Sequence, residues 1–478
     1  MLWTVAEIVK ATGGIVTKGG APLPLDEMER LEFSSVSIDS RTLSPGALYV
    51  AIMGVSQDGH QFVGAAVAAG AAAALVKVDY VPECDEGVLI RVPDPLVALE
   101  AMGRAARERM SGKVIAVTGS AGKTGTKEAL RVMLERCGKT HASVKSFNNH
   151  WGVPLSLARM PRDTDFAIFE VGMNHAGEIS PLSKMIRPDA ALITTIAPVH
   201  IGHFNNEVEI ADAKAEIFDG LVEGGVAILP VDNPHYDRLV EKAMAAGVAR
   251  IVPFGKAPAA EARMIGGQFD SEGSRVSAEI FEENQEFILA QAGVHVAVNM
   301  LAALAAVKLC GADLARAAPA LSTLEPPEGR GVRHKLQDAD GSILLIDESY
   351  NANPASMAIA LRGLAAITSV NYTRRIAVIG DMLELGDNAG HYHLELAPLI
   401  EDLEIDKVYA AGEIMAGLYE ALPEAVQGAY ALTAKELSQA VVSALKGGDV
   451  VMVKGSLGSE MSRVVTAITD AFAAEDAT

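Results

Sequence analysis

The sequence is poor in cysteine and aromatic residues and has no long hydrophobic run. Cysteine occurs three times, as Cys84, Cys137 and Cys310. Because these positions are few and far apart, neither a disulfide framework nor a cysteine-rich metal site is predicted. The longest weakly polar run, Val63 to Val76, falls short of the roughly 20 apolar residues that cross a bilayer. We therefore expect no membrane insertion, and the absence of a signal-like N-terminal pattern makes the cytoplasm the expected compartment.

Positive charge is also scarce. Lysine and arginine number 40 against 61 aspartates and glutamates, which gives a net charge of −21. A surface of this sign repels a nucleic-acid backbone and an anionic membrane, so neither is expected as a partner. If the substrate is itself an anion, individual lysines and arginines inside a pocket have to meet its charge.

The length of 478 residues predicts about three domains, since a domain commonly holds roughly 150 residues. Ser111-Gly-Lys113 separates a long helical stretch from a new apolar strand, and a Pro/Gly cluster at Glu325–Gly331 separates a helix from the next strand. The predicted domains are residues 1–110, 111–325 and 326–478. Hinges near residues 111 and 326 would let the domains close on a substrate.

Each of the three sections alternates short apolar strands with helical stretches, which is typical of α/β folds. The first section has a predicted strand at Phe33–Ile38 and a predicted helix at Gln61–Ala69. The middle section has a predicted strand at Ala190–Ile196, and the third a predicted helix at His393–Ile400. We expect a small α/β domain, a central domain with a parallel sheet like that of P-loop ATPases, and a Rossmann-like doubly wound C-terminal domain.

A glycine-rich loop after the strand Val114–Val117 is the strongest local signal. It reads Gly119-Ser-Ala-Gly-Lys123-Thr124 and runs into a helix. In such a loop the backbone amides bind phosphate oxygens, the lysine reaches the terminal phosphates and the threonine hydroxyl can bind magnesium. Val117 stands where a full P-loop has glycine. No Asn-Lys-x-Asp element for guanine follows, so ATP is predicted rather than GTP.

Two acidic residues at strand ends are candidate magnesium ligands. Glu170 and Asp347 each close an apolar strand, and Glu170 is favoured because its strand is expected in the sheet of the phosphate loop. His203, His391 and His393 have spacings that occur in zinc sites. Without a supporting cysteine cluster, zinc is not predicted.

Six motifs together resemble the Mur ligase family, and they run through all three predicted domains in order. The motifs are Thr118-Gly-Ser-Ala-Gly-Lys-Thr124, Phe147-Asn-Asn-His-Trp-Gly-Val-Pro-Leu155, Glu170-Val-Gly-Met-Asn-His-Ala-Gly-Glu-Ile179, Ala213-Lys-Ala-Glu-Ile217, Asp347-Glu-Ser-Tyr-Asn-Ala-Asn-Pro354 and Gly380-Asp-Met-Leu-Glu-Leu-Gly386. The last two resemble the branch of the family that adds D-alanyl-D-alanine to UDP-N-acetylmuramoyl-tripeptide. The resemblance implies ATP-dependent amide formation in peptidoglycan precursor synthesis, through an acyl phosphate, by an enzyme that we expect to be monomeric.

The resemblance also implies roles for individual residues. Lys123, His200 and Lys214 would act in catalysis, and Thr124, Glu170, His200 and a carbamylated Lys214 would hold two magnesium ions. The nucleotide-binding residues would be Gly119, Ser120, Ala121, Gly122, Lys123, Thr124, Gly125, Asn299, Arg330 and Asp347. The residues that bind the other substrates would be Ser40, Arg41, Asn148, Asn149, Tyr350, Asn351 and Asn353.

Two positions depart from the family pattern, and two other functions stay open. Val296 stands where relatives often have asparagine, and Leu457 where they usually have arginine. A sister amide ligase, adding a diamino acid or polymerising glutamate on folate, would share the phosphate loop and the central domain. An ATPase that drives a partner would turn over ATP without an amine acceptor. The motifs do not specify lysine or diaminopimelate as the third residue of the accepted peptide.

Overall fold

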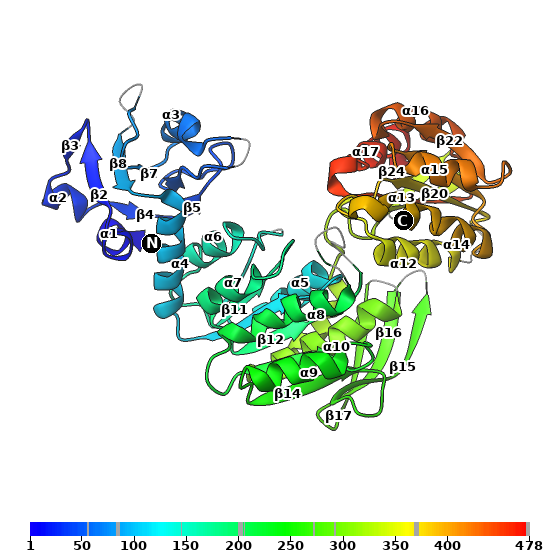
Figure 1. Ribbon diagram of the computed structural model, residues 1–478, viewed down its shortest axis with the longest axis horizontal. Helices are drawn as coiled ribbons and strands as arrows, with labels where there is room; N and C mark the ends of the chain where they lie inside the picture. Colours follow the sequence, from blue (N-terminus) through cyan, green and yellow to red (C-terminus); the bar gives the residue numbers. More distant parts are fainter. Residues whose placement is uncertain are drawn as a thin grey trace.

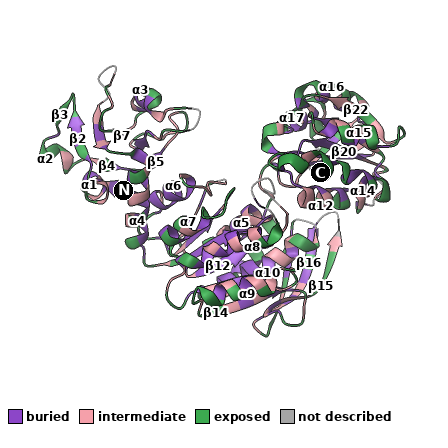
Figure 2. Cartoon of the chain, in the orientation of Figure 1, coloured by how far each residue is buried: buried purple, intermediate pink, exposed green. Residues whose placement is uncertain are grey.

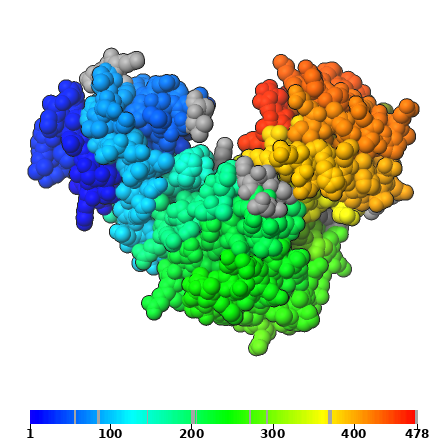
Figure 3. Space-filling view, viewed as in Figure 1, coloured from blue at the N-terminus to red at the C-terminus, as the bar shows by residue number. Residues whose placement is uncertain are grey.

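The computed structural model describes residues 1–474 apart from 55–56, 83–86, 145, 199–203, 205, 271–272, 291–292 and 368–371. The described strands form three large sheets and one two-stranded sheet. Figure 1 shows three lobes in chain order, with the first lobe in blue, the central lobe in cyan to green and the third in yellow to red. The first and third lobes both rest on the central one, and open space separates them in the space-filling view (Figure 3).

The first lobe is built on a six-stranded sheet in the order β3-β2-β8-β7-β6-β5. Its strands are β3 (Ala21–Pro22), β2 (Ile15–Lys18), β8 (Val88–Val92), β7 (Ala73–Lys77), β6 (Leu48–Val50) and β5 (Val36–Ser37). Helix α1 (Val5–Thr12) lies on one face and helix α3 (Val63–Ala68) on the other.

The single strand predicted over Phe33–Ile38 is wrong. The chain forms β4 (Glu32–Phe33), which pairs with β1 (Trp3–Thr4), and then β5 in the large sheet. Phe33 and Val36 are both buried in one core, although three residues apart they would face opposite sides of one strand. The backbone N–H of Ser34 donates to Gly46 O at 3.0 Å, and this turns the chain from one sheet to the other.

Three other predicted elements have different bounds. The helix predicted at Gln61–Ala69 is a 3₁₀ turn, η1 (Gly59–Phe62), followed by α3. The strand predicted at Ala190–Ile196 ends at Ile193 as β12. The helix predicted at His393–Ile400 is two helices, α13 (Ala389–Leu394) and α14 (Leu396–Asp402), which meet at Glu395.

The central lobe holds a nine-stranded sheet in the order β10-β11-β9-β12-β13-β14-β15-β16-β17. Neighbouring strands are parallel as far as β15, and β15, β16 and β17 are antiparallel. The strands are β10 (Thr140–Ala142), β11 (Phe166–Glu170), β9 (Lys113–Thr118), β12 (Ala190–Ile193), β13 (Val226–Pro230), β14 (Arg250–Gly255), β15 (Ala262–Asp270), β16 (Gly273–Ile280) and β17 (Glu283–Leu289). The predicted parallel sheet is therefore extended by an antiparallel hairpin region.

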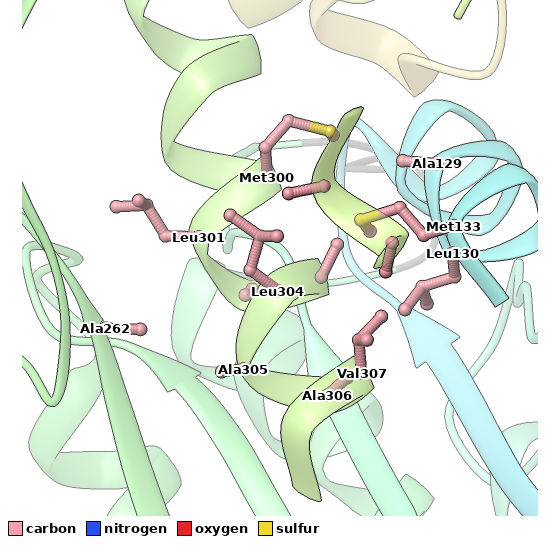
Figure 4. Close-up of a cluster of buried hydrophobic side chains, with 14 of the residues drawn as sticks. Ala129, Leu130, Met133, Ala262, Met300, Leu301, Leu304, Ala305, Ala306 and Val307 are labelled. Atoms are coloured by element: carbon pink, nitrogen blue, oxygen red, sulfur yellow. The ribbon is translucent and has the colours of Figure 1, made fainter. Parts of the chain in front are cut away.

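Helices cover both faces of the central sheet. One face carries α5 (Lys123–Glu135) and α10 (Val294–Leu309), which pack on each other and on the sheet through Leu130, Met133 and Leu304 (Figure 4). The other face carries α6 (Gly152–Ala158), α7 (Ile179–Ile186), α8 (Glu207–Ala215) and α9 (Tyr236–Ala245). Buried residues line the inner sides of these helices and the strands between them (Figure 2).

The third lobe has a seven-stranded sheet in the order β22-β21-β20-β23-β19-β18-β24. The first five are parallel, as the Rossmann-like prediction requires. The strands are β22 (Gln427–Ala431), β21 (Lys407–Ala411), β20 (Arg374–Gly380), β23 (Asp449–Lys454), β19 (Gly341–Glu348), β18 (Val332–Asp338) and β24 (Ala473–Ala474). Helices α12 (Pro354–Ala365), α13, α14 and α15 (Met415–Ala421) cover one face, and α16 (Ala434–Ala444) and α17 (Ser462–Ala471) the other.

The first and central lobes share part of one core. Helix α4 (Pro95–Glu108) packs against α6, and Leu155 and Ala158 of α6 lie in the core of the first lobe. Trp3 Nε1 donates to Ala158 O at 2.7 Å, across the same junction. This continuity leaves little freedom for a hinge near residue 111. The domain boundaries at 110 and 325 stay predictions.

Candidate active site

The phosphate loop connects β9 to α5, and two of its glycines allow close packing. Gly119 has φ +146°, and a Cβ there would lie 1.9 Å from Thr194 Oγ1. Gly122 has φ +81°, and a Cβ there would lie 2.3 Å from Asn299 Nδ2. Both positions therefore require glycine. The Asn299 side chain, expected to bind the nucleotide, lies against this loop.

The lysine of the loop folds back over it. Lys123 Nζ donates to Gly119 O at 2.7 Å. Burial lowers the pKa of Lys123, the positive charge of Arg330 lowers it further, and the Glu170 carboxylate opposes both effects. Arg330 lies at the start of the third lobe. Positively charged side chains from two lobes, Lys123 and Arg330, therefore repel each other at the phosphate loop. An anion such as a phosphoryl group would relieve this repulsion.

Glu170 ends β11 beside the phosphate loop and is 1% exposed. Thr124 Oγ1 donates to its Oε2 at 2.9 Å, and Asn148 Nδ2 donates to its Oε1 at 2.8 Å. Both carboxylate oxygens are thus held in place by neutral donors. A hydroxyl and a carboxylate oxygen at this spacing are ligands that Mg²⁺ prefers. Asn148, expected to bind substrate, holds the orientation of Glu170.

Lys214 lies near the end of α8 and is 2% exposed. Burial holds its pKa well below the usual value of 10.5, and the positive charge of Lys123 contributes in the same direction. The Lys214 amine is therefore biased toward its neutral form. His200, expected to join Lys214 at a metal, lies outside the described residues.

The described histidines do not form a zinc site. His393 is fully buried, its Nε2 accepts from Met382 N at 3.0 Å, and its Nδ1 donates to Ala389 O at 2.7 Å. His391 pairs with Glu395 at 3.2 Å. His203 lies outside the described residues. Within the described part of the chain, no group of three or more His, Cys, Asp or Glu side chains is arranged to hold a metal.

The third lobe places its motif residues at the carboxyl ends of β19 and β23. The Arg330 guanidinium carbon lies 4.4 Å from the centre of the Tyr350 ring. Lys454 Nζ, 3% exposed, donates to Asn351 O at 2.9 Å and to Glu348 Oε2 at 3.2 Å.

Asp347 and Asn353 both have structural partners. The Asp347 carboxylate accepts from Ser349 N at 3.0 Å. The Asn353 side chain accepts from Ser356 N at 2.9 Å, and Pro354 follows, so Asn353 caps α12. The residues expected to bind substrate thus also hold the local structure in place.

One cleft of about 2270 Å³ runs between the central and third lobes. Its lining includes many of the residues expected at the site: Ser120, Ala121, Gly122, Lys123, Gly125, Asn148, Asn149, Glu170, Asn299, Arg330, Asp347, Tyr350, Asn351 and Asn353. The lining does not include Thr124, Gly119 or Lys214. Of these, Thr124 and Gly119 lie directly beside it. The structure therefore brings the phosphate loop and the third-lobe motif to one space.

Ser40 and Arg41 lie apart from this cleft. They follow β5 in the first lobe, and Arg41 is 85% exposed in its side chain and pairs with Asp39 at 2.8 Å. A substrate that touched both this turn and the cleft would have to extend from the first lobe to the central one. A long substrate with an anionic end fits that geometry.

Two further residues at the site, Thr194 and Asn233, were not predicted from the sequence. Thr194 Oγ1 donates to Ala121 O at 2.5 Å and supports the phosphate loop. Asn233 donates to Ile196 O at 2.9 Å and lines the cleft. Thr194 directly follows β12, which lies beside β9. A predicted strand that ended at Ile193, instead of at Ile196, would have placed Thr194 in the loop next to the phosphate loop.

The two departures from the family pattern have different surroundings. Val296 packs against the central core and lines the cleft. Leu457 is 62% exposed and also lines the cleft.

None of the described helices has both the length and the hydropathy that a membrane crossing requires.

Comparison with known proteins gives matches along nearly the whole chain. Family models match for the Mur ligase family catalytic domain (residues 32–109), the Mur ligase middle domain (117–307) and the Mur ligase glutamate ligase domain (333–457).

Individual proteins match with similar completeness. The UDP-N-acetylmuramoyl-tripeptide–D-alanyl-D-alanine ligase of Rickettsia prowazekii is 32% identical, over 90% of this chain and 94% of that protein. The enzyme of the same name from Bacillus subtilis is 32% identical, over 96% of each. A crystal structure of MurF from Acinetobacter baumannii has a TM-score of 0.83 at 28% identity, and the match covers 98% of this chain and 99% of that one.

Proposed function

Because the chain belongs to the Mur ligase family, we propose that it joins D-alanyl-D-alanine to UDP-N-acetylmuramoyl-tripeptide in an ATP-dependent, ADP-forming reaction. The observation that carries this proposal is the common cleft, which the phosphate loop and the Tyr350–Asn353 segment both line. The full-length similarity to relatives of that name favours this reaction over those of sister ligases. No described feature favours an ATPase that drives a partner.

The chemistry requires activation of a carboxylate. A carboxylate does not acylate an amine at neutral pH, because its oxygen is a poor leaving group. Transfer of the terminal phosphoryl group of ATP to the tripeptide carboxylate gives an acyl phosphate and ADP. The dipeptide amine then forms the new C–N bond, and the bond to phosphate breaks as inorganic phosphate leaves. The product is the UDP-muramoyl-pentapeptide precursor of peptidoglycan.

The central lobe supplies the phosphoryl-transfer site. Backbone N–H groups of Ala121 to Thr124 would face the phosphates at the start of α5, where the helix dipole adds positive potential. Lys123 is already held at the loop, so little reorganisation is needed when negative charge develops. Arg330 brings a second cation from the third lobe. Positioning and charge neutralisation of this kind account for most catalysis of phosphoryl transfer.

The oxygens of Thr124 and Glu170 fit a magnesium ion, and these two residues would hold it. The ion would neutralise charge on the transferred phosphoryl group. Asn148 keeps Glu170 oriented for that role through the 2.8 Å hydrogen bond.

A second ion would be held by His200 and a carbamylated Lys214. An ammonium group cannot ligate a cation, so Lys214 needs the modification. Only the neutral amine adds carbon dioxide, and the burial that lowers the pKa of Lys214 favours that form. A carbamate carbon signal after exposure to ¹³C-labelled bicarbonate, absent from Lys214→Arg, is the expected result. Labelling that is equal in both proteins would contradict the assignment.

One chain supplies every lobe around the cleft, so we propose that the enzyme works as a monomer. Its substrates, ATP and a UDP-linked peptide, are compounds of the cytoplasm, and we place its activity there. Sedimentation at micromolar concentration should give the mass of one chain.

The direct test measures phosphate release from ATP and magnesium with UDP-N-acetylmuramoyl-tripeptide, in the presence and absence of D-alanyl-D-alanine. Mass analysis of the product accompanies it. Release should require both substrates, and the product should gain one dipeptide. Release that is independent of either substrate would instead support an ATPase. Lysine-containing and diaminopimelate-containing tripeptides, compared side by side, identify the natural one.

A further inference from the structure

Lys127 lies in α5, three residues after Thr124 and on the same side of the helix, and none of the roles described so far uses it. Its side chain is 0% exposed, the lowest value among the described lysines. Placing an ammonium group entirely inside a protein is costly, because water no longer solvates the charge. The partners that compensate for this cost indicate what the residue does.

The partners of Lys127 include an acid and a backbone carbonyl. Its Nζ lies 2.7 Å from Glu128 Oε1 and donates to Ser143 O at 2.8 Å. Burial acts to raise the pKa of Glu128, but hydrogen bonds from Lys127 and Arg131 outweigh it and hold this pKa below its usual value. Arg131 Nε lies 2.7 Å from Glu128 Oε2, and its side chain is 36% exposed. Glu128 therefore has a second, better solvated cation, and pairing with this acid does not by itself explain Lys127.

The carbonyl partner, Ser143, is the first residue after β10, the edge strand of the central sheet. The ladder between β10 and β11 ends with Ala142 opposite Ile168. Beyond this pair, Ser143 N donates to Ile168 O at 3.1 Å, and Glu170 N donates to Ser143 Oγ at 3.3 Å. Ser143 therefore holds the backbone of Glu170 at the point where the ladder has ended.

The connection from β10 to α6 also reaches the side chains of the proposed magnesium site. Gly172 N donates to Asn148 O at 2.8 Å, and Asn148 Nδ2 donates to Glu170 Oε1 at 2.8 Å. Ser146 Oγ lies 3.5 Å from Thr124 Oγ1. The position of this connection therefore determines how Glu170 and Thr124 are presented.

We propose that Lys127 is a positioning residue for the magnesium site. By holding Ser143 O it fixes the connection after β10, and Ser143 and Asn148 in turn fix the backbone and the carboxylate of Glu170. This inference rests on the proposed function, which places magnesium at Thr124 and Glu170. Lys127 is outside the cleft lining, so it acts through these partners. Residues that orient a metal ligand in this way tune the affinity of the site for the ion.

A role in the fold alone is the alternative. Methionine at position 127 would fill a similar volume without the cost of burying a charge. It would lack the donor for Ser143 O, which is the bond that connects α5 to the segment beside Glu170. The two roles differ in what the loss of this bond does to metal binding.

The test compares Lys127→Met with the wild type, and uses Arg131→Met as the matched control. Each variant removes one of the two cations of Glu128, and only the first removes the donor to Ser143 O. Calorimetry measures binding of a non-hydrolysable ATP analogue in magnesium and in EDTA. In magnesium, Lys127→Met should bind the analogue roughly 10-fold or more weakly than the wild type, because a ligand of the ion has lost its orientation. In EDTA the affinities should agree within about twofold, and Arg131→Met should match the wild type in both conditions.

Ser143→Ala tests the second step of the same route. It keeps the carbonyl that Lys127 holds and removes the hydroxyl that accepts from Glu170 N. Its affinity for the analogue should fall in magnesium and stay the same in EDTA. The double variant should lose less than the product of the two single effects, because both residues act on the same contact. Wild-type affinity of Ser143→Ala in magnesium would overturn the route, also in the event that Lys127→Met does not fold.

The possible failures are distinguishable. A wild type whose binding of the analogue does not depend on magnesium would contradict the metal site of the proposed function. A wild type that depends on magnesium, with Lys127→Met showing the same dependence, would overturn this inference alone. A lower melting temperature together with that result would assign Lys127 to the fold. Equal weakening in magnesium and in EDTA would also overturn the inference, because it would reveal a defect of the phosphate loop itself.

Discussion

At the scale of single residues, Gly122 of the phosphate loop should not tolerate a side chain. Gly122→Ala should weaken ATP binding roughly tenfold or more, because a left-handed backbone costs about 1–2 kcal/mol for alanine and the new Cβ would collide with Asn299. Gly390→Ala is the matched control. Gly390 lies in α13, away from the cleft lining, with no atom within 4 Å of a new Cβ, so ATP binding should persist and stability should rise by roughly 0.5–1 kcal/mol. Calorimetric titration with ATP and thermal melts measure both, and equal loss in the two variants would contradict this.

The residue types at the site were predictable, whereas several of their contacts were not. The spacing of glycine, lysine and threonine identifies a phosphate loop because local backbone geometry determines that function. The contact of Asn148 with Glu170 joins the loop before α6 to the end of β11, and these segments are adjacent in space and separate in sequence. No local pattern carries that information, and the same holds for the burial that lowers the pKa of Lys214.

At the scale of elements, His393 joins α13 to the loop after β20, and this contact should depend on pH. Burial lowers the pKa of His393 below its usual 6.5, against the opposing effects of the Ala389 carbonyl and the Asp381 charge. Between the lowered pKa of His393 in the folded protein and the usual value of about 6.5 in the unfolded chain, the unfolded chain binds more protons. The free energy of unfolding therefore falls as the pH drops below about 6.5. Protonated Nε2 could not accept from Met382 N.

His393→Gln tests this contact, since glutamine can accept a hydrogen bond but does not titrate. Stability curves from pH 7.5 to 5 should differ in slope below 6.5, by on the order of 1 kcal/mol over the range. Parallel curves for the two proteins would show that His393 does not contribute to the acid sensitivity.

Element types followed from the sequence more reliably than element ends. The strand Val88–Val92 and the strands of the third lobe are clear because apolar runs there are bounded by turn residues. The prediction for Phe33–Ile38 failed because its mixture of apolar residues and serines resembles one half-buried strand and does not reveal the change of sheet at Ser34, where the backbone N–H bonds to Gly46 O. Polar residues such as Thr194 end a strand or continue it according to what packs beside them.

At the scale of the whole molecule, the cleft of about 2270 Å³ is larger than the roughly 300–1,000 Å³ of common ligand sites. Since the first and central lobes share a core, we expect closure to occur by movement of the third lobe about residues 325–331. A compact chain of this length would have a radius of gyration of about 23 Å. Small-angle scattering should give a larger value for the free protein and a decrease toward this one with a non-hydrolysable ATP analogue and both other substrates. No change on adding all three would contradict closure.

Three domains and their α/β classes could be predicted because length and alternation of strands and helices constrain them. Their relative placement could not, since it depends on contacts such as that of Trp3 with Ala158, between residues far apart in the sequence.

The junction between the first and central lobes also makes the protein a natural optical probe. Its two tryptophans are Trp3 and Trp151. The Arg109 guanidinium carbon lies 3.9 Å from the centre of the Trp3 ring, and Trp151 packs edge-on against Phe147 at 5.3 Å. Both indoles therefore report on this junction, and the third lobe contains none. Intrinsic fluorescence should follow the arrival of the UDP-linked substrate, while the movement of the third lobe needs an attached dye to be seen.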